Sequence, residues 1–200
     1  VSRRGVARDV VAVFAAAYLK NARYVNPVTG ERFELEDAID FLSDARRADV
    51  AHRGTIVCAG IRRWKQLHFK AFLSGTATTL QFIWNFDEAL ATAKSLNARL
   101  AVWAAKCTDG DVAKARKAGV PLLRVEDGFI RSIGLGSDYE TPYSLVTDSK
   151  GIYYDPAGPS DLEAILNRLA GNSADYTWEL ARARRLRHFI VSRGITKYNL

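Results

Sequence analysis

The sequence predicts an α/β fold: a Rossmann-like parallel sheet with helices on both faces, preceded by a short helical segment. Three observations favour this fold class. Short apolar runs, typical of fully buried strands, alternate with amphipathic stretches of helical period. Residues that cap helices stand at the starts of several of these stretches. Of the 200 residues, 48% are hydrophobic and 26% are charged, which is enough apolar material for a sizeable core.

The first part of the chain, residues 1–50, is expected to be a helical linker ahead of the main domain. Apolar residues recur at helical spacing in residues 6–20 and again in residues 34–47. Between these two predicted helices, the stretch NPVTGE (residues 26–31) contains a proline and a glycine and predicts a turn.

The main domain, residues 51–200, is expected to alternate strands with helices. Such alternation indicates βαβ units, a parallel sheet and right-handed crossovers. Glu126 is expected at the end of the fourth strand, and Ser160 with Glu163 matches a capping box at a helix start. The expected strands are residues 55–60, 78–84, 99–104, 121–125 and 143–148, and the expected helices are residues 62–73, 87–96, 109–118, a helix beginning at 160, and 174–193.

The charge of the chain indicates an anionic partner. The formal net charge is +7, and four arginines and a histidine crowd into ARARRLRHF, residues 181–189. This stretch is interpreted either as a solvated helix face or as a patch for an acidic membrane surface or a phosphate. Nucleic acid is disfavoured because few aromatic residues are interleaved with the basic ones. No apolar run approaches the roughly 20 residues that a membrane-spanning helix needs.

Several common kinds of site find no support in the sequence. The G-x-G-x-x-G spacing, the P-loop and the G-x-S-x-G nucleophile elbow are all absent from it. Its three histidines have no spacing that builds a metal site, so no metal is expected. Cys58 and Cys107 lie in apolar segments and are expected to be free thiols.

Ligands of open parallel sheets bind outside the carboxyl ends of the strands. Here those ends are residues 60–65, 84–86, 104–106 and 126–132. In the first segment, Gly60 permits close approach of the backbone to a ligand. Arg62, Arg63 and Lys65 place positive charge near a helix start, which suits an anion. The alternative interpretation is a charged helix start with Trp64 packed into the core.

The sharpest candidate is the run Glu126–Asp127–Gly128, which follows an apolar strand. Adjacent side chains on an extended chain point to opposite sides, so one acid can face a crevice while the other holds the loop. Gly128 permits a tight turn, and Arg131 is placed to pair with a neighbouring carboxylate. The alternative interpretation is an Asx-type turn at a strand end with a solvated glutamate.

Longer stretches of the sequence resemble a known family. RVEDGFIRSIGLG, SLVTDSKGIYYD and PSDLEAIL are similar to segments of the capsule polysaccharide β-Kdo transferases, the KpsC-like family of bacterial capsule assembly. The WK pair after the first strand and SRGITKYN near the end are similar too. The resemblance covers most of the chain from about residue 55 onward, and ARYVNPVTGE resembles the segment leading into the second transferase module of such proteins.

This resemblance implies one half of a GT-B glycosyltransferase, in which two Rossmann-like halves enclose the active site. Such enzymes move Kdo from CMP-Kdo to a lipid-linked Kdo acceptor in capsule linker synthesis, with retention of configuration. Retention is most simply explained by a carboxylate nucleophile. By its match to the family's E/D-D-G element, Asp127 is the expected nucleophile. Glu126 is the second expected catalytic residue, acting either chemically or as a support, and Gly128, Arg131 and Ser132 are the expected supporting and substrate-binding residues.

The resemblance also implies the remaining contacts and partners. Gly60, Arg63, Trp64 and Lys65 are expected to bind substrate, with no cofactor or metal besides the donor CMP-Kdo. Other capsule assembly proteins are expected partners, in the cytoplasm, with peripheral attachment to the inner membrane left open. The family's His-Pro element for the CMP phosphate does not occur in the sequence. The residues are therefore expected to form the acceptor-side half, without the C-terminal nucleotide-binding half, and to be inactive alone.

The competing class is a non-catalytic α/β ligand-binding or interaction domain in which the EDG run is only a turn. The position of Asp127 distinguishes the two classes. A catalytic carboxylate should lie at the carboxyl edge of the sheet, partly open, within reach of the loop at Gly60.

Overall fold

The computed structural model describes residues 2–3, 5–27, 29–134, 140–172 and 176–199. The chain divides into two compact units, Val1–Ala51 and His52–Leu200. Each unit is described by itself below.

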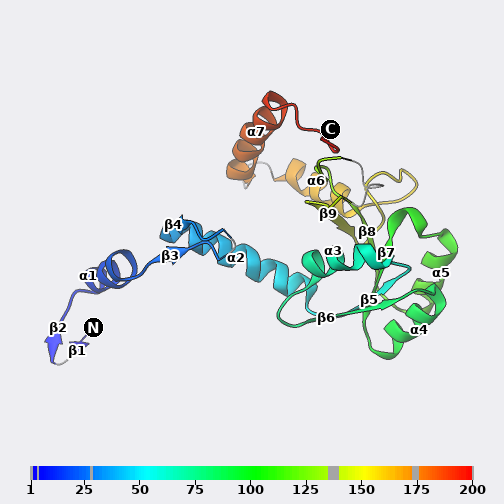
Figure 1. The fold of residues 1–200 in the computed structure, drawn as a ribbon, viewed down its shortest axis with the longest axis horizontal. Coiled ribbons are helices and arrows are strands. Elements are labelled where there is room, and N and C mark those ends of the chain that lie inside the picture. Colours follow the sequence, from blue (N-terminus) through cyan, green and yellow to red (C-terminus); the bar gives the residue numbers. More distant parts are fainter. Residues whose placement is uncertain (1, 4, 28, 135–139, 173–175, 200) are drawn as a thin grey trace. The chain divides into compact units, whose positions relative to one another are not determined.

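The first unit consists of two small hairpins and two helical stretches (Figure 1). Strands β1 (Ser2–Arg3) and β2 (Val6–Ala7) pair antiparallel, as do β3 (Tyr24–Val25) and β4 (Arg32–Phe33). The helical stretches are α1 (Val10–Phe14), which continues as the π-helix η1 (Ala15–Asn21), and α2 (Leu35–His52).

Two boundaries in this unit differ from the sequence-based expectation. The first helix begins at Val10 rather than at residue 6, because Asp9 caps it by accepting a hydrogen bond from the Ala12 N–H at 2.8 Å. The second helix continues to His52 rather than ending at residue 47. The expected turn at residues 26–31 joins the strands of the second hairpin, where the Asn26 N–H donates to the Glu31 carbonyl.

The second unit is built on a five-stranded sheet with the strand order β6-β5-β7-β8-β9 (Figure 1). Its first four strands in sequence run parallel, and the fifth pairs antiparallel with the fourth. The strands are β5 (Gly54–Ala59), β6 (Thr78–Ile83), β7 (Arg99–Trp103), β8 (Leu122–Asp127) and β9 (Leu145–Asp148). The helices are α3 (Arg63–Leu73), α4 (Phe86–Ser95), η2 (Ala104–Lys106), α5 (Asp109–Ala118), α6 (Asp161–Gly171) and α7 (Thr177–Ser192).

The expected α/β fold is confirmed, with one change of direction at the edge of the sheet. The segment between β8 and β9, residues 128–144, contains no helix in its described part. A parallel neighbour usually requires a helical crossover, so a chain that returns without one pairs antiparallel. β9 also begins at Leu145, two residues after the predicted start. The predicted start of the last helix, residue 174, lies outside the described residues.

Helices cover both faces of the sheet, as the sequence predicts, because alternate residues of β5 point to opposite sides. Val57 and Ala59 pack with Ala89 and Ala93 of α4. Ile56 and Cys58 belong to a second core cluster, which also contains two side chains of α3. Those two are Phe69 and Leu73. Cys58 and Cys107 are free thiols, as expected, and burial raises the pKa of Cys58 to about 12.

Helix caps fix where the crossover helices begin and end. Asn85 caps α4 by accepting from the Glu88 N–H at 3.0 Å. Thr108 and Asp111 form a reciprocal capping box on α5, and Gly119 ends this helix with a φ of +70°. Ser160 caps α6.

Asp148, the last residue of β9, connects the sheet edge to α6. Its side chain is 1% exposed and accepts hydrogen bonds from the backbone N–H groups of Lys150 at 2.9 Å, Gly151 at 2.8 Å and Asp161 at 3.1 Å. A buried carboxylate is stable only when it is hydrogen-bonded in this way. The aspartate of the VTDSKG run therefore orders the loop that leads into α6.

Replacing Asp148 with Asn should destabilise this unit. The amide is neutral and offers one acceptor oxygen, so its N–H₂ group would face backbone donors that the carboxylate now satisfies. Because hydrogen bonds to charged groups contribute about 1.5–3 kcal/mol each, we expect a loss of about 2 kcal/mol or more in the free energy of unfolding, measured in urea. Asp155→Asn is the matched control, since Asp155 is exposed and accepts one bond from the Ala157 N–H. Equal losses in both variants would contradict this role.

Candidate active site

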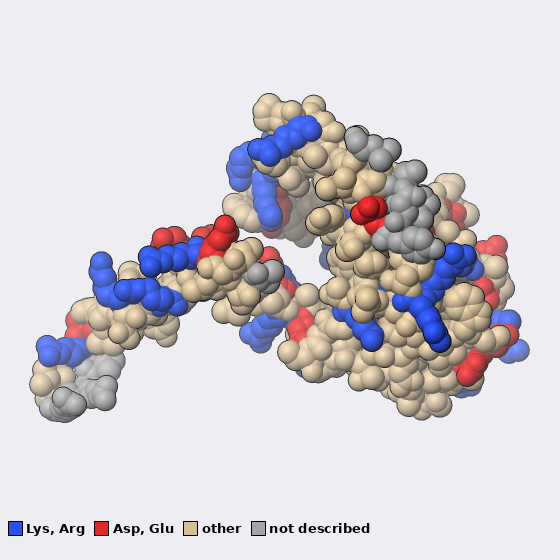
Figure 2. Space-filling view, viewed as in Figure 1, with Lys and Arg blue, Asp and Glu red and all other residues tan. Residues whose placement is uncertain are grey.

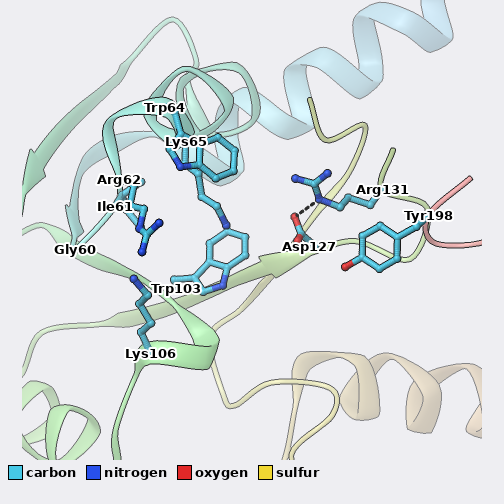
Figure 3. A pocket seen from close by; sticks show the side chains of 10 residues that line it. All are labelled: Gly60, Ile61, Arg62, Trp64, Lys65, Trp103, Lys106, Asp127, Arg131 and Tyr198. Carbon is cyan, nitrogen blue, oxygen red and sulfur yellow. Dashed lines mark ion pairs between the residues drawn. The ribbon is translucent and has the colours of Figure 1, made fainter. Parts of the chain in front are cut away.

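A pocket of about 440 Å³ opens at the carboxyl edge of the sheet. Figure 3 shows that its walls come from the loop after β5, the start of α3, the ends of β7 and β8, and the C-terminal segment. The lining residues are Gly60, Ile61, Arg62, Trp64, Lys65, Trp103, Lys106, Asp127, Arg131 and Tyr198. The pocket therefore lies where the strand-end rule places a ligand in this class of fold.

Asp127 is the carboxylate of this pocket. It is the last residue of β8, its side chain is 15% exposed, and its Oδ1 lies 3.1 Å from Nε of Arg131 (Figure 3). The Arg131 side chain is 1% exposed, and its Nε makes no hydrogen bond to the described residues. The two groups are thus paired by charge without hydrogen-bond alignment. Asp127 lies at the carboxyl edge and shares the pocket with Gly60, as expected of a catalytic carboxylate.

Arg131 is held in place by contacts of both its guanidinium group and its backbone. Its Nη1 donates to Oγ of Ser132 at 2.7 Å, and that hydroxyl in turn donates to the Gly134 carbonyl at 2.8 Å. The Arg131 N–H donates to the carbonyl of Lys197 at 2.9 Å. Ser132 is 2% exposed and does not line the pocket. It therefore supports Arg131, whereas direct substrate contact was also expected of it.

The C-terminal segment completes the pocket. Residues 197–199 run beside Ser132, with a parallel bridge between Ser132 and Tyr198 and a hydrogen bond from the Asn199 N–H to the Ser132 carbonyl at 2.9 Å. This pairing brings Tyr198 into the pocket wall (Figure 3). Tyr198 is far from Asp127 in the sequence, so residue spacing alone gave no signal that it belongs to the site. Only the family resemblance of SRGITKYN pointed to this segment.

Lys65 lies beside two tryptophan rings inside the pocket. Its Nζ lies 3.3 Å from the centre of the Trp103 ring and 5.2 Å from that of Trp64, both within the range of cation–π attraction. Burial lowers the pKa of Lys65, and the negative charges of Asp127 and Glu126 oppose this effect. Trp64 is half-buried and lines the pocket, where a substrate-binding residue was expected, so the alternative interpretation that it packs into the core is not supported.

Glu126 points away from the pocket, as alternation along a strand requires. Its Oε1 accepts from the Asp127 N–H at 3.0 Å, and its Oε2 lies 3.4 Å from the Tyr154 hydroxyl. Burial and then the charge of Glu126 raise the pKa of Tyr154. Glu126 therefore holds the strand end against the segment after β9.

Gly60 and Gly128, the two glycines expected at the site, are required for different structural reasons. Gly60 has a φ of +64°, a conformation that favours glycine, and its N–H donates to the Ile83 carbonyl. Gly128 has an ordinary φ, but a Cβ there would lie 2.1 Å from Oγ of Ser144. Gly128 is thus required by the close packing of the segment before β9, and it does not line the pocket.

Arg63 is absent from the pocket wall, and its neighbour Arg62 lines the pocket instead. Arg63 lines a separate hollow on the same edge of the sheet. Sequence analysis also missed Trp103, whose apolar strand offered no signal. Lys106 lies in the strand-end segment 104–106, where a site residue was expected, although it was not singled out.

The charges of the pocket favour an anionic ligand. Four cations, Arg62, Lys65, Lys106 and Arg131, accompany the single carboxylate of Asp127. No group of three or more His, Cys, Asp or Glu side chains among the described residues could hold a metal ion. Outside the pocket, Figure 2 shows Lys and Arg side chains gathered over α7, none of whose residues is buried. Within the described residues, no helix is long and apolar enough to cross a membrane.

Together, the fold and the pocket define an α/β domain with a mostly parallel sheet and a cationic pocket that contains one carboxylate. Residues 99–199 match the family of capsule polysaccharide biosynthesis proteins. The chain belongs to this family, which confirms the resemblance seen in the sequence.

Individual relatives agree with this assignment. The capsule polysaccharide modification protein LipA of Neisseria meningitidis serogroup B is 37% identical over 199 residues, which are 100% of this chain and 28% of LipA. The lipopolysaccharide-processing protein LpsZ of Rhizobium meliloti is 45% identical over 86 residues, 43% of this chain and 19% of LpsZ. The solved structure of Thermosulfurimonas dismutans KpsC, a beta Kdo 2,4 transferase, superposes with a TM-score of 0.51 at 30% identity. This match covers 74% of this chain and 43% of that one. The chain thus spans less than a third of LipA.

The electrostatic coupling in the pocket can be tested through the pKa of Lys65. Asp127→Asn removes a negative charge that raises this pKa, so the pKa should fall further. Lys106→Gln removes a positive charge that lowers it, so the pKa should rise. ¹³C NMR of the lysine Cε resonances over a pH titration measures both shifts.

The lowered pKa of Lys65 also predicts how the stability of the folded state changes with pH. The folded state binds fewer protons than the unfolded state between the lowered pKa of Lys65 and its ordinary value. The free energy of unfolding should therefore rise with pH across that window. For the two variants, pKa shifts of Lys65 in the same direction in Asp127→Asn and in Lys106→Gln would show that Lys65 does not lie between the charges of Asp127 and Lys106.

Proposed function

We propose that this chain is part of a glycosyltransferase that moves Kdo from CMP-Kdo to a lipid-linked Kdo acceptor in capsule linker synthesis. The single observation that carries the proposal is the place of Asp127, a carboxylate at the carboxyl edge of the sheet within a pocket of cations and tryptophans. Membership of the capsule polysaccharide biosynthesis family and the likeness to the KpsC transferase support it.

The proposed reaction uses Asp127 as a nucleophile. One carboxylate oxygen attacks the anomeric carbon of Kdo, the bond from that carbon to the phosphate of CMP breaks, and CMP leaves as an anion. A hydroxyl of the acceptor then attacks the same carbon and passes its proton to water, and the bond from that carbon to Asp127 breaks, which releases the carboxylate. Two inversions at one carbon give net retention.

The surroundings of Asp127 suit this role. Arg131 lies 3.1 Å from one of its oxygens, and the lack of hydrogen-bond alignment leaves that contact less directional. Kdo and CMP are both anionic, so Arg62, Lys65 and Lys106 would attract and orient them. The Trp64 and Trp103 rings offer apolar faces to a sugar ring.

Glu126 has a supporting role in this proposal. Its side chain contacts Tyr154 and the Asp127 N–H, on the side of the strand away from the pocket. It therefore acts by fixing the strand end that carries Asp127. The non-catalytic binding domain is the less favoured function, because it gives no reason for a carboxylate to lie among cations that attract anions.

The partners follow from the same reaction. CMP-Kdo is the donor, no metal or other cofactor takes part, and nucleic acid is not a partner. The exposed arginines of α7 would face the acidic inner membrane from the cytoplasmic side, where a lipid-linked acceptor and other capsule assembly proteins reside.

Asp127→Asn, made in the full-length natural protein, should keep the fold and remove nearly all transfer. The two side chains are nearly isosteric, but a neutral amide is a poor nucleophile towards an anomeric carbon. We expect transfer to fall on the order of a thousandfold or more, measured as Kdo incorporation into a Kdo-terminated acceptor. Mass spectrometry of the unmodified protein with CMP-Kdo alone should find one Kdo on the peptide that contains Asp127.

Glu126→Gln is the matched control, because it removes the neighbouring carboxylate without touching the pocket. Its transfer rate should fall much less than that of Asp127→Asn. If Asp127→Asn transfers at near the normal rate with unchanged stereochemistry, Asp127 is not the nucleophile.

A further inference from the structure

Trp84 is a large apolar side chain left open to solvent on the ligand-binding edge of the sheet. It is the first residue after β6, and 69% of its surface is exposed. The pocket loop lies directly beside it, since the Gly60 N–H donates to the Ile83 carbonyl at 3.0 Å. A Cβ on Gly60 would lie 3.7 Å from the Trp84 carbonyl. An exposed tryptophan beside a proposed active site is an unusual use of apolar surface.

The pocket that contains Asp127 is called the main pocket from here on. Trp84 lines two hollows that adjoin it. The larger, of about 430 Å³, shares Ile61 with the main pocket. The smaller, of about 90 Å³, shares Gly60, Trp103 and Lys106 with it. The main pocket and the two hollows therefore lie next to one another in a stretch along the strand ends, with Trp84 at its outer end, after the edge strand β6.

The charges beside Trp84 match those of the main pocket. Arg63 lines the larger hollow and Lys106 lines the smaller one, and both residues are exposed. The smaller hollow also contains Asp111, but both partners of its carboxylate oxygen Oδ2 belong to the Thr108 cap of α5. The outer end of the stretch thus offers an aromatic face flanked by cations.

We propose that Trp84, with Arg63 and Lys106 beside it, forms an outer subsite for a further sugar unit of an anionic glycan acceptor. This inference rests on the proposed function, since it takes the main pocket as the place where the acceptor's terminal sugar reacts. The chemistry is that of an acidic oligosaccharide: the indole covers the apolar face of a sugar ring, and the two cations pair with its carboxylate. The proposal gives Arg63 a role outside the main pocket.

The geometry favours a glycan over a protein partner for this surface. A docked protein needs a broad apolar patch, whereas Trp84 is the one exposed large apolar side chain among the residues that line the two hollows. A chain of acidic sugars presents charge at regular intervals. Cations at both the main pocket and the outer hollows therefore complement a ligand that occupies them in succession.

The test compares the binding of two probes, Kdo and a linear Kdo trisaccharide, by calorimetry with the chain in its unsubstituted form. The trisaccharide should bind about fivefold to tenfold more tightly, because it gains the contact with Trp84. Trp84→Ala should reduce this ratio to near one and leave the affinity for Kdo itself within about twofold. Arg63→Gln should reduce the ratio in part.

Trp178→Ala is the matched control, since Trp178 is another exposed tryptophan, 63% exposed, on α7. It should leave the ratio unchanged. A ratio near one in the unsubstituted chain, or one that survives Trp84→Ala, overturns the outer subsite while Kdo binding still supports the proposed function. If neither probe binds, the acceptor site itself is wrong and both proposals fail. If Trp84→Ala instead abolishes self-association in sedimentation, the surface is a protein interface and the subsite is overturned.

Discussion

The buried ion pair between Arg131 and Asp127 is the constraint on which the site depends. Arg131 is the largest fully buried side chain in the described part of the chain, and Asp127 is the acid with which it forms an ion pair. An uncompensated buried charge is costly, so the guanidinium must have its partners in place whenever the domain is folded. The guanidinium pairs with a carboxylate of β8 and the Arg131 N–H donates to the Lys197 carbonyl, so one residue brings distant segments together.

This arrangement fixes the carboxylate more firmly than the loops around it. Asp127 belongs to a strand that is paired on both sides, with β7 and β9. Glu126 anchors the same strand end from the opposite face through Tyr154. A nucleophile must be held within a fraction of an ångström of its productive position, and rigid elements achieve this better than loops. The adjacent acids of the EDG run thus divide one task, with one side chain in the pocket and the other behind it.

The fold was predictable because its signals are local. Buried strands, capped helices and alternation along the chain indicate a parallel sheet without knowledge of distant contacts. The direction of β9 was not predictable in this way, because it depends on how the residues between Gly128 and Ser144 return across the sheet edge. A Cβ at Gly128 would collide with Ser144, a constraint that is visible only in three dimensions.

The site was predictable only in part, for the same reason. The strand-end rule located Asp127, the last residue of β8, and Lys65, which lies at the start of the helix that follows β5. It did not place Tyr198, which reaches the pocket through a bridge to Ser132 across 66 positions of sequence. The strand-end rule also selected Arg63, whereas Arg62 lines the pocket in the structure. A helix start turns by about 100° per residue, and this angle decides which of two neighbouring side chains faces the pocket.

The two sides of the pocket differ in their relation to the family. Residues 99–199, the part that matches the family of capsule polysaccharide biosynthesis proteins, contain Asp127, Arg131 and Tyr198. Arg62 and Lys65 lie before that part of the chain. The carboxylate and its supporting contacts therefore lie within the part of the chain that matches the family. Arg62 and Lys65 thus come from a separate βα unit, whereas Lys106, the third cation opposite Asp127, lies within the matched part. In the proposed mechanism, β8 therefore supplies the nucleophile, whereas the loop after β5 and the start of α3 supply Arg62 and Lys65, which attract the anionic substrates.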